Sequence, residues 1–341
     1  MKLTVHHFDL PLRHPFTISR ETTTVQPTVI VELSEAETAG FGEATTNRYY
    51  GVTTESMTAA IESVRGLLDD VSLQQTSPEQ LWTQLHDQLA DNPFALCAVD
   101  QAAYDLWGKL QGRAVYDLWG LNLAHIPASC FTIGIDSLEV MVQKLNEMSG
   151  WPIYKIKLGT DHDVEIIRAL RAETDAIFRV DANCGWQVEE TIRNATELQS
   201  LGVEFIEQPL PADNFAGHLE VFKHSPLPIL ADESCITESD VARCAGHFHG
   251  VNIKLVKCGG LTPARRMIAE AKSLGLSVMV GCMTESTVGI SAIAQLLPLL
   301  DYVDMDGAAL LASDIASGVR LEQGVCRFPS IPGNGVSLTD L

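Results

Sequence analysis

The spacing of apolar side chains predicts two different structures in the first third of the chain. Apolar and polar side chains alternate along the first fifty residues, as in the segment TVIVEL at 28–33, which is typical of an antiparallel meander. Between residues 53 and 119 the apolar side chains recur at steps of three and four, and Ser77 followed by Pro78 marks the start of one helix. Strands followed by helices predict an α+β domain over residues 1–124.

A repeating pattern covers residues 125–317. Short apolar or β-branched runs end abruptly about every 25 residues, at Thr132, Lys157, Asp181, Glu207, Asp232, Lys254, Gly281 and Asp306. That interval is the length of one strand, one helix and two loops, so eight repeats predict a (β/α) barrel. The polar residues fall at the predicted carboxyl ends of the strands, where barrel enzymes place their chemistry. After residue 317 the helical period is lost, and we expect residues 318–341 to form a tail that returns to the first domain.

Composition and charge narrow the class of protein. The chain has 341 residues, of which 46% are hydrophobic, and this excludes a disordered or fibrous protein. A net charge of −21 repels phosphate backbones and anionic lipids, so neither nucleic acid nor a membrane is an expected partner. The apolar stretch at 287–300 is too short to span a bilayer, and the first ten residues lack a signal core. The eight cysteines show no C-x-x-C pair, and we expect buried thiols in a cytoplasmic protein.

Three carboxylates stand at consecutive predicted strand ends. They are Asp181 in FRVDAN, Glu207 in VEFIEQP and Asp232 in PILADES. Oxygen ligands with no His or Cys beside them suit a hard cation such as Mg²⁺. A single acidic residue at a strand end could equally cap the next helix, but three in succession favour a metal site.

Lysines flank these carboxylates. Lys155 and Lys157 end the second predicted barrel strand and share one of its faces, because residues two apart in a strand point the same way. Lys254 ends the sixth strand, so it faces them across a closed barrel, whereas Lys257 is interpreted as a loop residue. Two opposed bases beside a metal favour removal and return of a proton next to a carboxylate, through an enediolate.

The motifs together resemble a known family. The sequence is similar to the muconate-lactonising subgroup of the enolase superfamily, and most of all to the dipeptide epimerases. The similarity lies in Lys155-x-Lys157, Asp181-Ala182-Asn183, Glu207-Gln208-Pro209, Asp232-Glu233-Ser234, Asn252-Ile253-Lys254 and Asp304-x-Asp306. It implies an α/β fold, namely a modified TIM barrel with an N-terminal α+β capping domain. It also implies Mg²⁺ on Asp181, Glu207 and Asp232, with Lys157 and Lys254 as the acid/base pair.

The resemblance also implies how a dipeptide would bind. In dipeptide epimerases the acidic pair after the eighth strand holds the substrate ammonium, and Asp304 and Asp306 match that position. Arg20 matches an arginine that binds a glutamate side chain in L-Ala-D/L-Glu epimerases. Lys155, Thr132, Cys282, Met283 and Thr284 complete the predicted substrate-binding residues. The chain departs from the family around residues 282–286 and 45–52, and Glu285 would oppose an anionic substrate if it pointed inward.

Alternatives remain open from the sequence. Besides an L-Ala-D/L-Glu epimerase, the motifs are compatible with a hydrophobic dipeptide epimerase, with an o-succinylbenzoate synthase or cycloisomerase, and with a non-catalytic binding protein. The ammonium site favours an epimerase. The oligomeric state, including a homo-oligomer, is left open. The short motif Gly40-x-Gly42 lacks the third glycine of a dinucleotide site and is interpreted as a turn.

Overall fold

The structure is a computed structural model that describes residues 1–339. Its N-terminal capping domain has a three-stranded antiparallel sheet in the order β1-β2-β3, which confirms the predicted meander. The strands are β1 (Lys2–Thr17), β2 (Thr22–Glu35) and β3 (Thr38–Thr45). The helices are α1 (Thr54–Ser63), α2 (Arg65–Asp69), α3 (Pro78–Leu89), α4 (Pro93–Gln111) and α5 (Val115–Leu118). As predicted, Ser77 caps α3 and Pro78 is its first residue.

The motif Gly40-x-Gly42 is not a turn, contrary to the sequence interpretation. Both glycines lie inside β3, where the strand packs directly on α4. A Cβ on Gly40 would lie 2.2 Å from the backbone nitrogen of Leu106, and one on Gly42 would lie 2.0 Å from the backbone oxygen of Ala98. The two glycines are therefore needed for the close approach of strand and helix.

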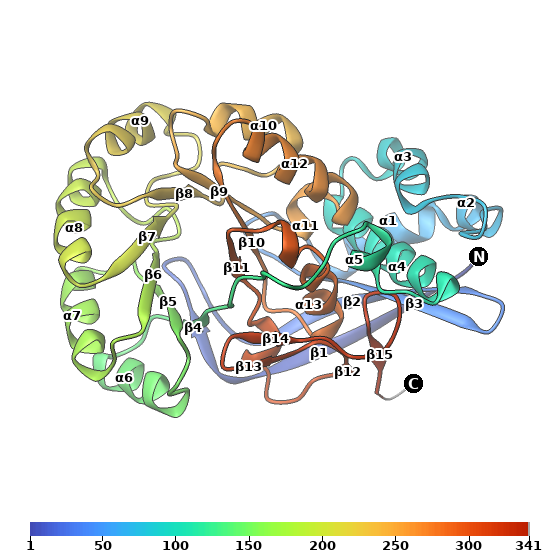
Figure 1. The fold of residues 1–341 in the computed structure, drawn as a ribbon, viewed down its shortest axis with the longest axis horizontal. Coiled ribbons are helices and arrows are strands. Elements are labelled where there is room, and N and C mark those ends of the chain that lie inside the picture. The colour runs from blue at the N-terminus through green and yellow to red at the C-terminus, as the bar shows by residue number, and fades with distance from the viewer. Residues whose placement is uncertain (340–341) are drawn as a thin grey trace.

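The second part of the chain is the predicted barrel (Figure 1). Eight parallel strands lie in sequence order: β4 (Phe131–Ile133), β5 (Ile153–Lys157), β6 (Ile177–Asp181), β7 (Val203–Glu207), β8 (Ile229–Ala231), β9 (Gly250–Ile253), β10 (Ser277–Gly281) and β11 (Tyr302–Asp304). The connecting helices are α6 (Leu138–Glu147), α7 (Asp163–Glu173), α8 (Val188–Ser200), α9 (Phe215–His224), α10 (Glu238–Cys244), α11 (Leu255–Cys258), α12 (Leu261–Ser273) and α13 (Thr287–Ala294), with η1 (Leu297–Leu299).

The barrel is modified at its eighth unit. After β11 the chain forms only the short 3-10 helix η2 (Gly307–Leu310) in place of a full α-helix. The first and last strands meet through a single bridge between Ser129 and Val303, without a continuous ladder. The carboxylate of Asp306 accepts hydrogen bonds from the backbone nitrogen and the hydroxyl of Thr132 across this seam. A side chain at the mouth therefore helps to close the barrel.

The end of the chain packs on the capping domain. The strand β12 (Ala316–Ser317) pairs antiparallel with β15 (Ser337–Leu338), and between them β13 (Arg320–Glu322) and β14 (Val325–Arg327) form a short hairpin. The backbone nitrogen of Asn334 donates to Asp105 of α4. Residues 340–341 of the predicted tail lie outside the described residues, and the boundaries near residues 124 and 317 stay predictions.

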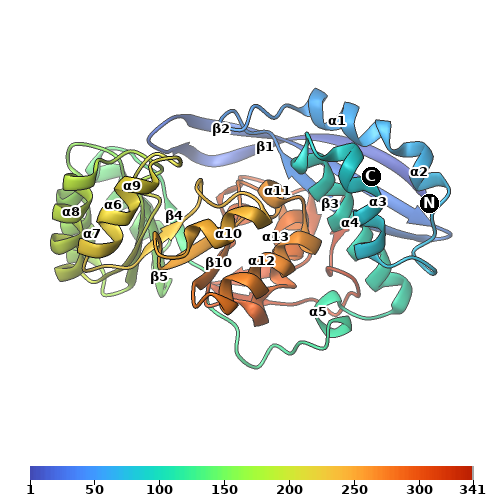
Figure 2. The same ribbon diagram turned by 90° about the horizontal axis from the view of Figure 1, so that it is seen from above.

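The long β1–β2 hairpin reaches from the helices of the capping domain to the barrel, as Figure 2 shows from above. Near its turn, the Ser19 hydroxyl and the Arg20 guanidinium donate to the backbone oxygen of Asn183, which follows β6. The capping domain thus covers the carboxyl ends of the barrel strands. Within residues 1–339, no helix is long and apolar enough to cross a membrane. All eight cysteines are free thiols, and six of them are buried.

Candidate active site

The three predicted metal ligands come together at the barrel mouth. Asp181 and Glu207 are the last residues of β6 and β7, and Asp232 follows β8 directly. One oxygen from each carboxylate lies within 4.8 Å of the other two, and all three side chains are buried. Neighbouring parallel strands end at the same edge, so their last side chains converge. Three hard oxygen ligands without nitrogen or sulfur fit Mg²⁺.

One oxygen of this cluster accepts no hydrogen bond. Glu207 accepts a hydrogen bond from Asn252 on Oε1, at 2.7 Å, but its buried Oε2 accepts none. The Lys155 ammonium lies 2.8 Å from Oε2 without the geometry of a hydrogen bond. Burial and the negative charge of Asp181 raise the pKa of Glu207 to about 7. A buried carboxylate oxygen without a hydrogen bond is costly, and a bound metal ion would relieve that cost.

Two lysines face the cluster from opposite sides. The Lys157 ammonium donates to Asp181 at 2.6 Å, and the Lys254 ammonium donates to Asp232 at 2.7 Å. Lys157 ends β5 and Lys254 follows β9, so the three carboxylate strands lie between them. Burial lowers the pKa of Lys254, but the surrounding carboxylates, Asp232 first among them, together outweigh it, and the net shift is upward. The structure therefore brings together the predicted acid/base pair, whose roles stay predictions.

Lys155 links the two acidic groups of the mouth. Its ammonium lies 2.7 Å from Asp304, 2.8 Å from Glu207 and 3.3 Å from Asp181. Burial alone would lower the pKa of Lys155, but these carboxylates raise it well above its usual value. Lys155 is thus held charged between the carboxylate cluster and the predicted ammonium site.

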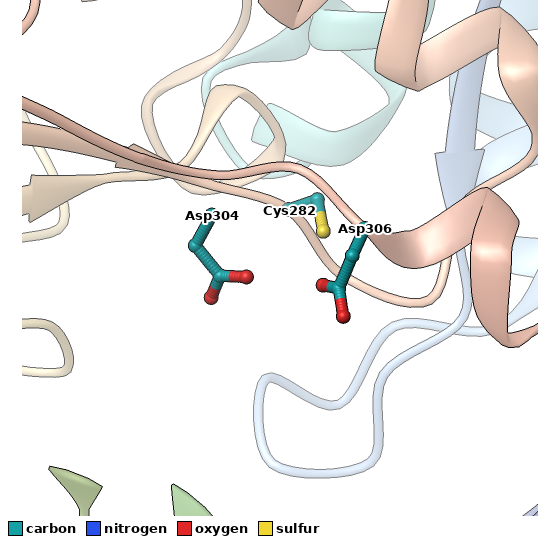
Figure 3. A group of neighbouring side chains, drawn as sticks. All are labelled: Cys282, Asp304 and Asp306. Carbon is teal, nitrogen blue, oxygen red and sulfur yellow. The ribbon is translucent and has the colours of Figure 1, made fainter. Parts of the chain in front are cut away.

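The predicted ammonium site lies at the end of β11. Figure 3 shows Asp304, Asp306 and Cys282 pointing into one space. Burial and the charge of Asp304 raise the pKa of Asp306 well above its usual value. The pKa of Asp304 is lowered, because the Lys155 ammonium outweighs the effect of burial. The pair therefore carries a shared negative charge that suits a substrate ammonium group.

Arg20 reaches the mouth from the capping domain, but its charge is already paired. Its guanidinium donates to Glu233 at 2.8 Å and stacks over the ring of Tyr49, 4.3 Å from the ring centre. The Arg20 side chain keeps 30% of its surface exposed. It remains able to contact a substrate, although Glu233 competes for it.

Glu285 does not point into the mouth. It is 2% exposed, its Oε1 accepts a hydrogen bond from the backbone nitrogen of Met283, and it does not line the cavity that residues 282–284 line. Burial and the charge of Glu43 raise its pKa to about 8. The conflict with an anionic substrate that the sequence left open therefore does not arise.

One cavity contains most of the predicted site. It is lined by the predicted residues Arg20, Thr132, Lys155, Lys157, Asp232, Lys254, Cys282, Met283, Thr284, Asp304 and Asp306. Asp181 and Glu207 do not line the cavity; they are fully buried and contact Lys155, which does line it. Asn47 and Tyr50, from the 45–52 segment in which the sequence departs from the family, form part of its wall.

Sequence reasoning missed two groups that hold the metal cluster. Lys257 is not a loop residue: it lies in α11, and its ammonium donates to Asp232 at 2.6 Å. Gln208 accepts from the backbone nitrogens of Asp232 and Ser234. The spacing of Lys254 and Lys257, one turn apart if helical, was the available signal for the lysine. The sequence carries no comparable signal for this role of Gln208, because its partners lie 24 and 26 residues further along the chain.

The site has three carboxylates at consecutive strand ends of a barrel, with lysines on both sides. This arrangement is typical of metal-assisted enzymes that move a proton on the carbon next to a substrate carboxylate. Comparison with known proteins identifies the family within that class. Residues 1–120 match the mandelate racemase / muconate lactonizing enzyme N-terminal domain, and residues 138–340 match the enolase C-terminal domain-like family. The chain therefore belongs to the enolase superfamily, as the resemblance in the sequence predicted.

Individual relatives are similar along their whole length. An L-Ala-D/L-amino acid epimerase of Flavobacterium johnsoniae is 56% identical over 99% of this chain and 100% of its own. The structure of a substrate-liganded L-Ala-D/L-Glu epimerase from Bacillus subtilis matches with a TM-score of 0.94 at 28% identity, covering 100% of both chains. A dipeptide epimerase from Methylococcus capsulatus, complexed with Mg and L-Arg-D-Lys, matches with a TM-score of 0.90 at 32% identity over 98% and 99%.

Proposed function

We propose that the protein is a Mg²⁺-dependent dipeptide epimerase that inverts the α-carbon of the second residue in L-Ala-X dipeptides. The observation that carries this proposal is the placement of Lys157 and Lys254 on opposite sides of one carboxylate cluster, in one cavity. One lysine removes the α-proton and the other returns a proton to the opposite face, which inverts the configuration. The relative from F. johnsoniae supports L-Ala as the first residue.

Asp181, Glu207 and Asp232 would hold the metal ion. Bound there, Mg²⁺ supplies Lewis-acid stabilisation for the negative charge that develops on the substrate carboxylate. The chain contributes Lys155, whose fixed positive charge lies against the same carboxylates and beside the same developing charge. The burial of these groups strengthens every charge interaction at the reacting carbon.

Asp304 and Asp306 distinguish an epimerase from the lyases of the superfamily. A lyase needs one basic lysine and no ammonium site, whereas a free dipeptide carries an ammonium group that must be neutralised in a buried site. The two carboxylates lie next to the Lys155 side of the cavity, so they would hold the amino end of the substrate. Thr132, Cys282, Met283 and Thr284 would form the surrounding walls.

The side chain of the second residue would face Arg20 and the 45–52 segment. Because Glu233 already compensates Arg20, the site accepts an acidic side chain without requiring one. We therefore expect L-Ala-L-Glu among several L-Ala-X substrates. A cytoplasmic location belongs to the same proposal and is supported by the eight free thiols.

The test is deuterium incorporation at the α-carbon. L-Ala-L-Glu, L-Ala-L-Leu and N-acetyl-L-Ala-L-Glu are each incubated with enzyme and Mg²⁺ in deuterated water and followed by NMR. We expect deuteration with epimerisation of the free dipeptides and little turnover of the acetylated control, which lacks the ammonium group. Formation of an unsaturated product would indicate a lyase. If no dipeptide of an L-Ala-X library exchanged its α-proton, an enzymatic role would be contradicted.

A further inference from the structure

The Lys257 ammonium is the most completely enclosed cation at the barrel mouth. It is 1% exposed and donates to four oxygens. Two belong to Asp232, namely Oδ1 at 2.6 Å and the backbone oxygen at 2.5 Å. The others are the backbone oxygens of Cys235 at 2.9 Å and Asn252 at 3.2 Å. Three carbonyls and one carboxylate therefore fix the position of this group.

Lys257 approaches Asp232 from behind the cavity. It does not line the cavity, whereas Lys254 does, and Lys254 donates to the other oxygen of Asp232, Oδ2, at 2.7 Å. The two ammonium groups thus hold opposite edges of one carboxylate. A group outside the cavity cannot touch a dipeptide, so any effect of Lys257 on the reaction passes through Asp232.

The capping domain fixes α11, which carries Lys257. This helix is capped at its C-terminal end by Gly259, whose backbone is left-handed with φ 94° and whose oxygen accepts a hydrogen bond from the Trp82 indole at 2.9 Å. A Cβ on Gly259 would lie 3.2 Å from Leu96 of α4. The backbone nitrogens of Gly259 and Gly260 both donate to Leu255. Packing against α3 and α4 therefore leaves Lys257 little freedom to move.

We propose that Lys257 is a positioning residue that orients Asp232 as a metal ligand. The inference rests on the proposed function, because it assumes that the carboxylate cluster binds a divalent cation. With Oδ1 and the backbone oxygen of Asp232 held by Lys257 and Oδ2 held by Lys254, the rotation of the carboxylate is fixed. Without Lys257, only Lys254 would hold the carboxylate, and it would be free to rotate away from the orientation that the cluster needs. Loss of a partner that orients a metal ligand typically weakens metal binding about 10- to 100-fold.

The test compares Lys257→Met with Lys109→Met in the full-length protein. Lys109 is a matched control, since its ammonium is also largely buried and donates to Asp105 and to two backbone oxygens, far from the mouth. Mn²⁺ binding is measured by the EPR signal of the free ion, and folding by circular dichroism. We expect the Mn²⁺ dissociation constant to rise about 10- to 100-fold in Lys257→Met and to stay unchanged in Lys109→Met.

A second measurement separates positioning from a catalytic role. Activity lost in Lys257→Met should recover as the Mg²⁺ concentration is raised, whereas activity lost in Lys254→Met should not. If Lys257→Met does not fold, Lys257→Gln is used, because its amide still donates to the carbonyls without carrying the charge.

Three outcomes would contradict the proposal that Lys257 positions Asp232. Unchanged or tighter Mn²⁺ binding in the variant would overturn the proposal, because the lysine would then act only as a charge that repels the metal. Failure of both Lys257 variants to fold, with Lys109→Met folded, would make it a structural residue and overturn the proposal as well. If the wild-type protein binds no Mn²⁺ at all, the proposed function fails together with the inference.

Discussion

Two sets of buried carboxylates occupy different regions of this molecule. The mouth carboxylates, Asp181, Glu207 and Asp232, lie at the ends of barrel strands and contact lysine ammonium groups. The interface carboxylates, Glu43 and Asp100, come from the capping domain and cap barrel helices. Glu43 accepts from the backbone nitrogens of residues 286 and 289 at the start of α13, and Asp100 accepts from residue 262 in the first turn of α12.

The partners of each carboxylate decide what it can do. The backbone and hydroxyl groups that donate to Asp100 and Glu43 are uncharged, and they do not fully offset the effect of burial on the pKa. The pKa of Asp100 is therefore raised to about 7, and that of Glu43 is also raised. At the mouth the lysines outweigh burial and lower the pKa values of Asp181 and Asp232. The interface carboxylates are enclosed by fixed donors, whereas Glu207 keeps an oxygen without a hydrogen bond. The first arrangement joins two domains, and the second can bind a cation.

Replacing a carboxylate by an amide should lower turnover at the mouth and change stability at the domain interface. Glu207→Gln, at the mouth, should give the largest effect on turnover. The glutamine oxygen can still accept from Asn252, so the fold should be kept. Loss of a charged metal ligand should lower epimerisation at least about 10³-fold. Activity is followed by deuterium exchange and stability by thermal unfolding. Near wild-type turnover at limiting Mg²⁺ would remove Glu207 from the metal site.

Replacing the lysines that face the mouth carboxylates should have the next largest effect. Lys157→Ala and Lys254→Ala should each lower epimerisation at least about 100-fold, because one face of the α-carbon loses its base. Each variant should still exchange the α-proton of one stereoisomer, and the two variants should retain opposite ones. The measurement is NMR exchange on L,L and L,D dipeptides. Epimerisation that persists in Lys254→Ala would exclude it as a base.

A smaller effect is expected where an ion pair lies at the rim of the mouth. Arg20→Ala should lower kcat/KM for L-Ala-L-Glu about 10-fold, near the lower end of what a charge-assisted hydrogen bond contributes, since Glu233 already shares the guanidinium. L-Ala-L-Leu serves as the control and should barely change. Equal losses for both dipeptides would show that Arg20 supports the loop and does not select the side chain.

The interface counterpart, Asp100→Asn, should have the smallest effect on turnover and act on stability instead. An asparagine can still accept from the backbone nitrogen of Thr262 and donate to its hydroxyl. Because the folded pKa of Asp100 lies above its unfolded value, the folded state binds the extra proton, and wild-type stability falls as pH rises from about 4 to about 7.

The variant lacks this titration. Its free energy of unfolding relative to wild type should therefore increase by at most about 1.4 kcal/mol per pH unit within that window and stay constant above it. Urea unfolding at several pH values measures the difference. A difference that does not vary with pH would mean that the pKa of Asp100 is the same in the folded and unfolded protein.

The sequence by itself determined the barrel and the identity of its mouth residues. A strand and a helix recur about every 25 residues, and the last residue of each parallel strand must lie at the same edge, so Asp181, Glu207 and Asp232 could be placed together without coordinates. Alternation and helical spacing likewise predicted the capping domain, because both periods follow from local backbone geometry.

Only the tertiary structure decided how the charges are distributed among partners. Lys257 and Gly42 show the reason. Lys257 contacts an oxygen of Asp232, which lies 25 residues earlier in the chain, and Gly42 packs against the backbone of helix α4. Arg20 is paired with Glu233, and Asp306 of the last barrel unit accepts hydrogen bonds from Thr132 of the first. These contacts join residues far apart in sequence, and no local period encodes which acidic group receives a lysine and which receives a backbone N–H.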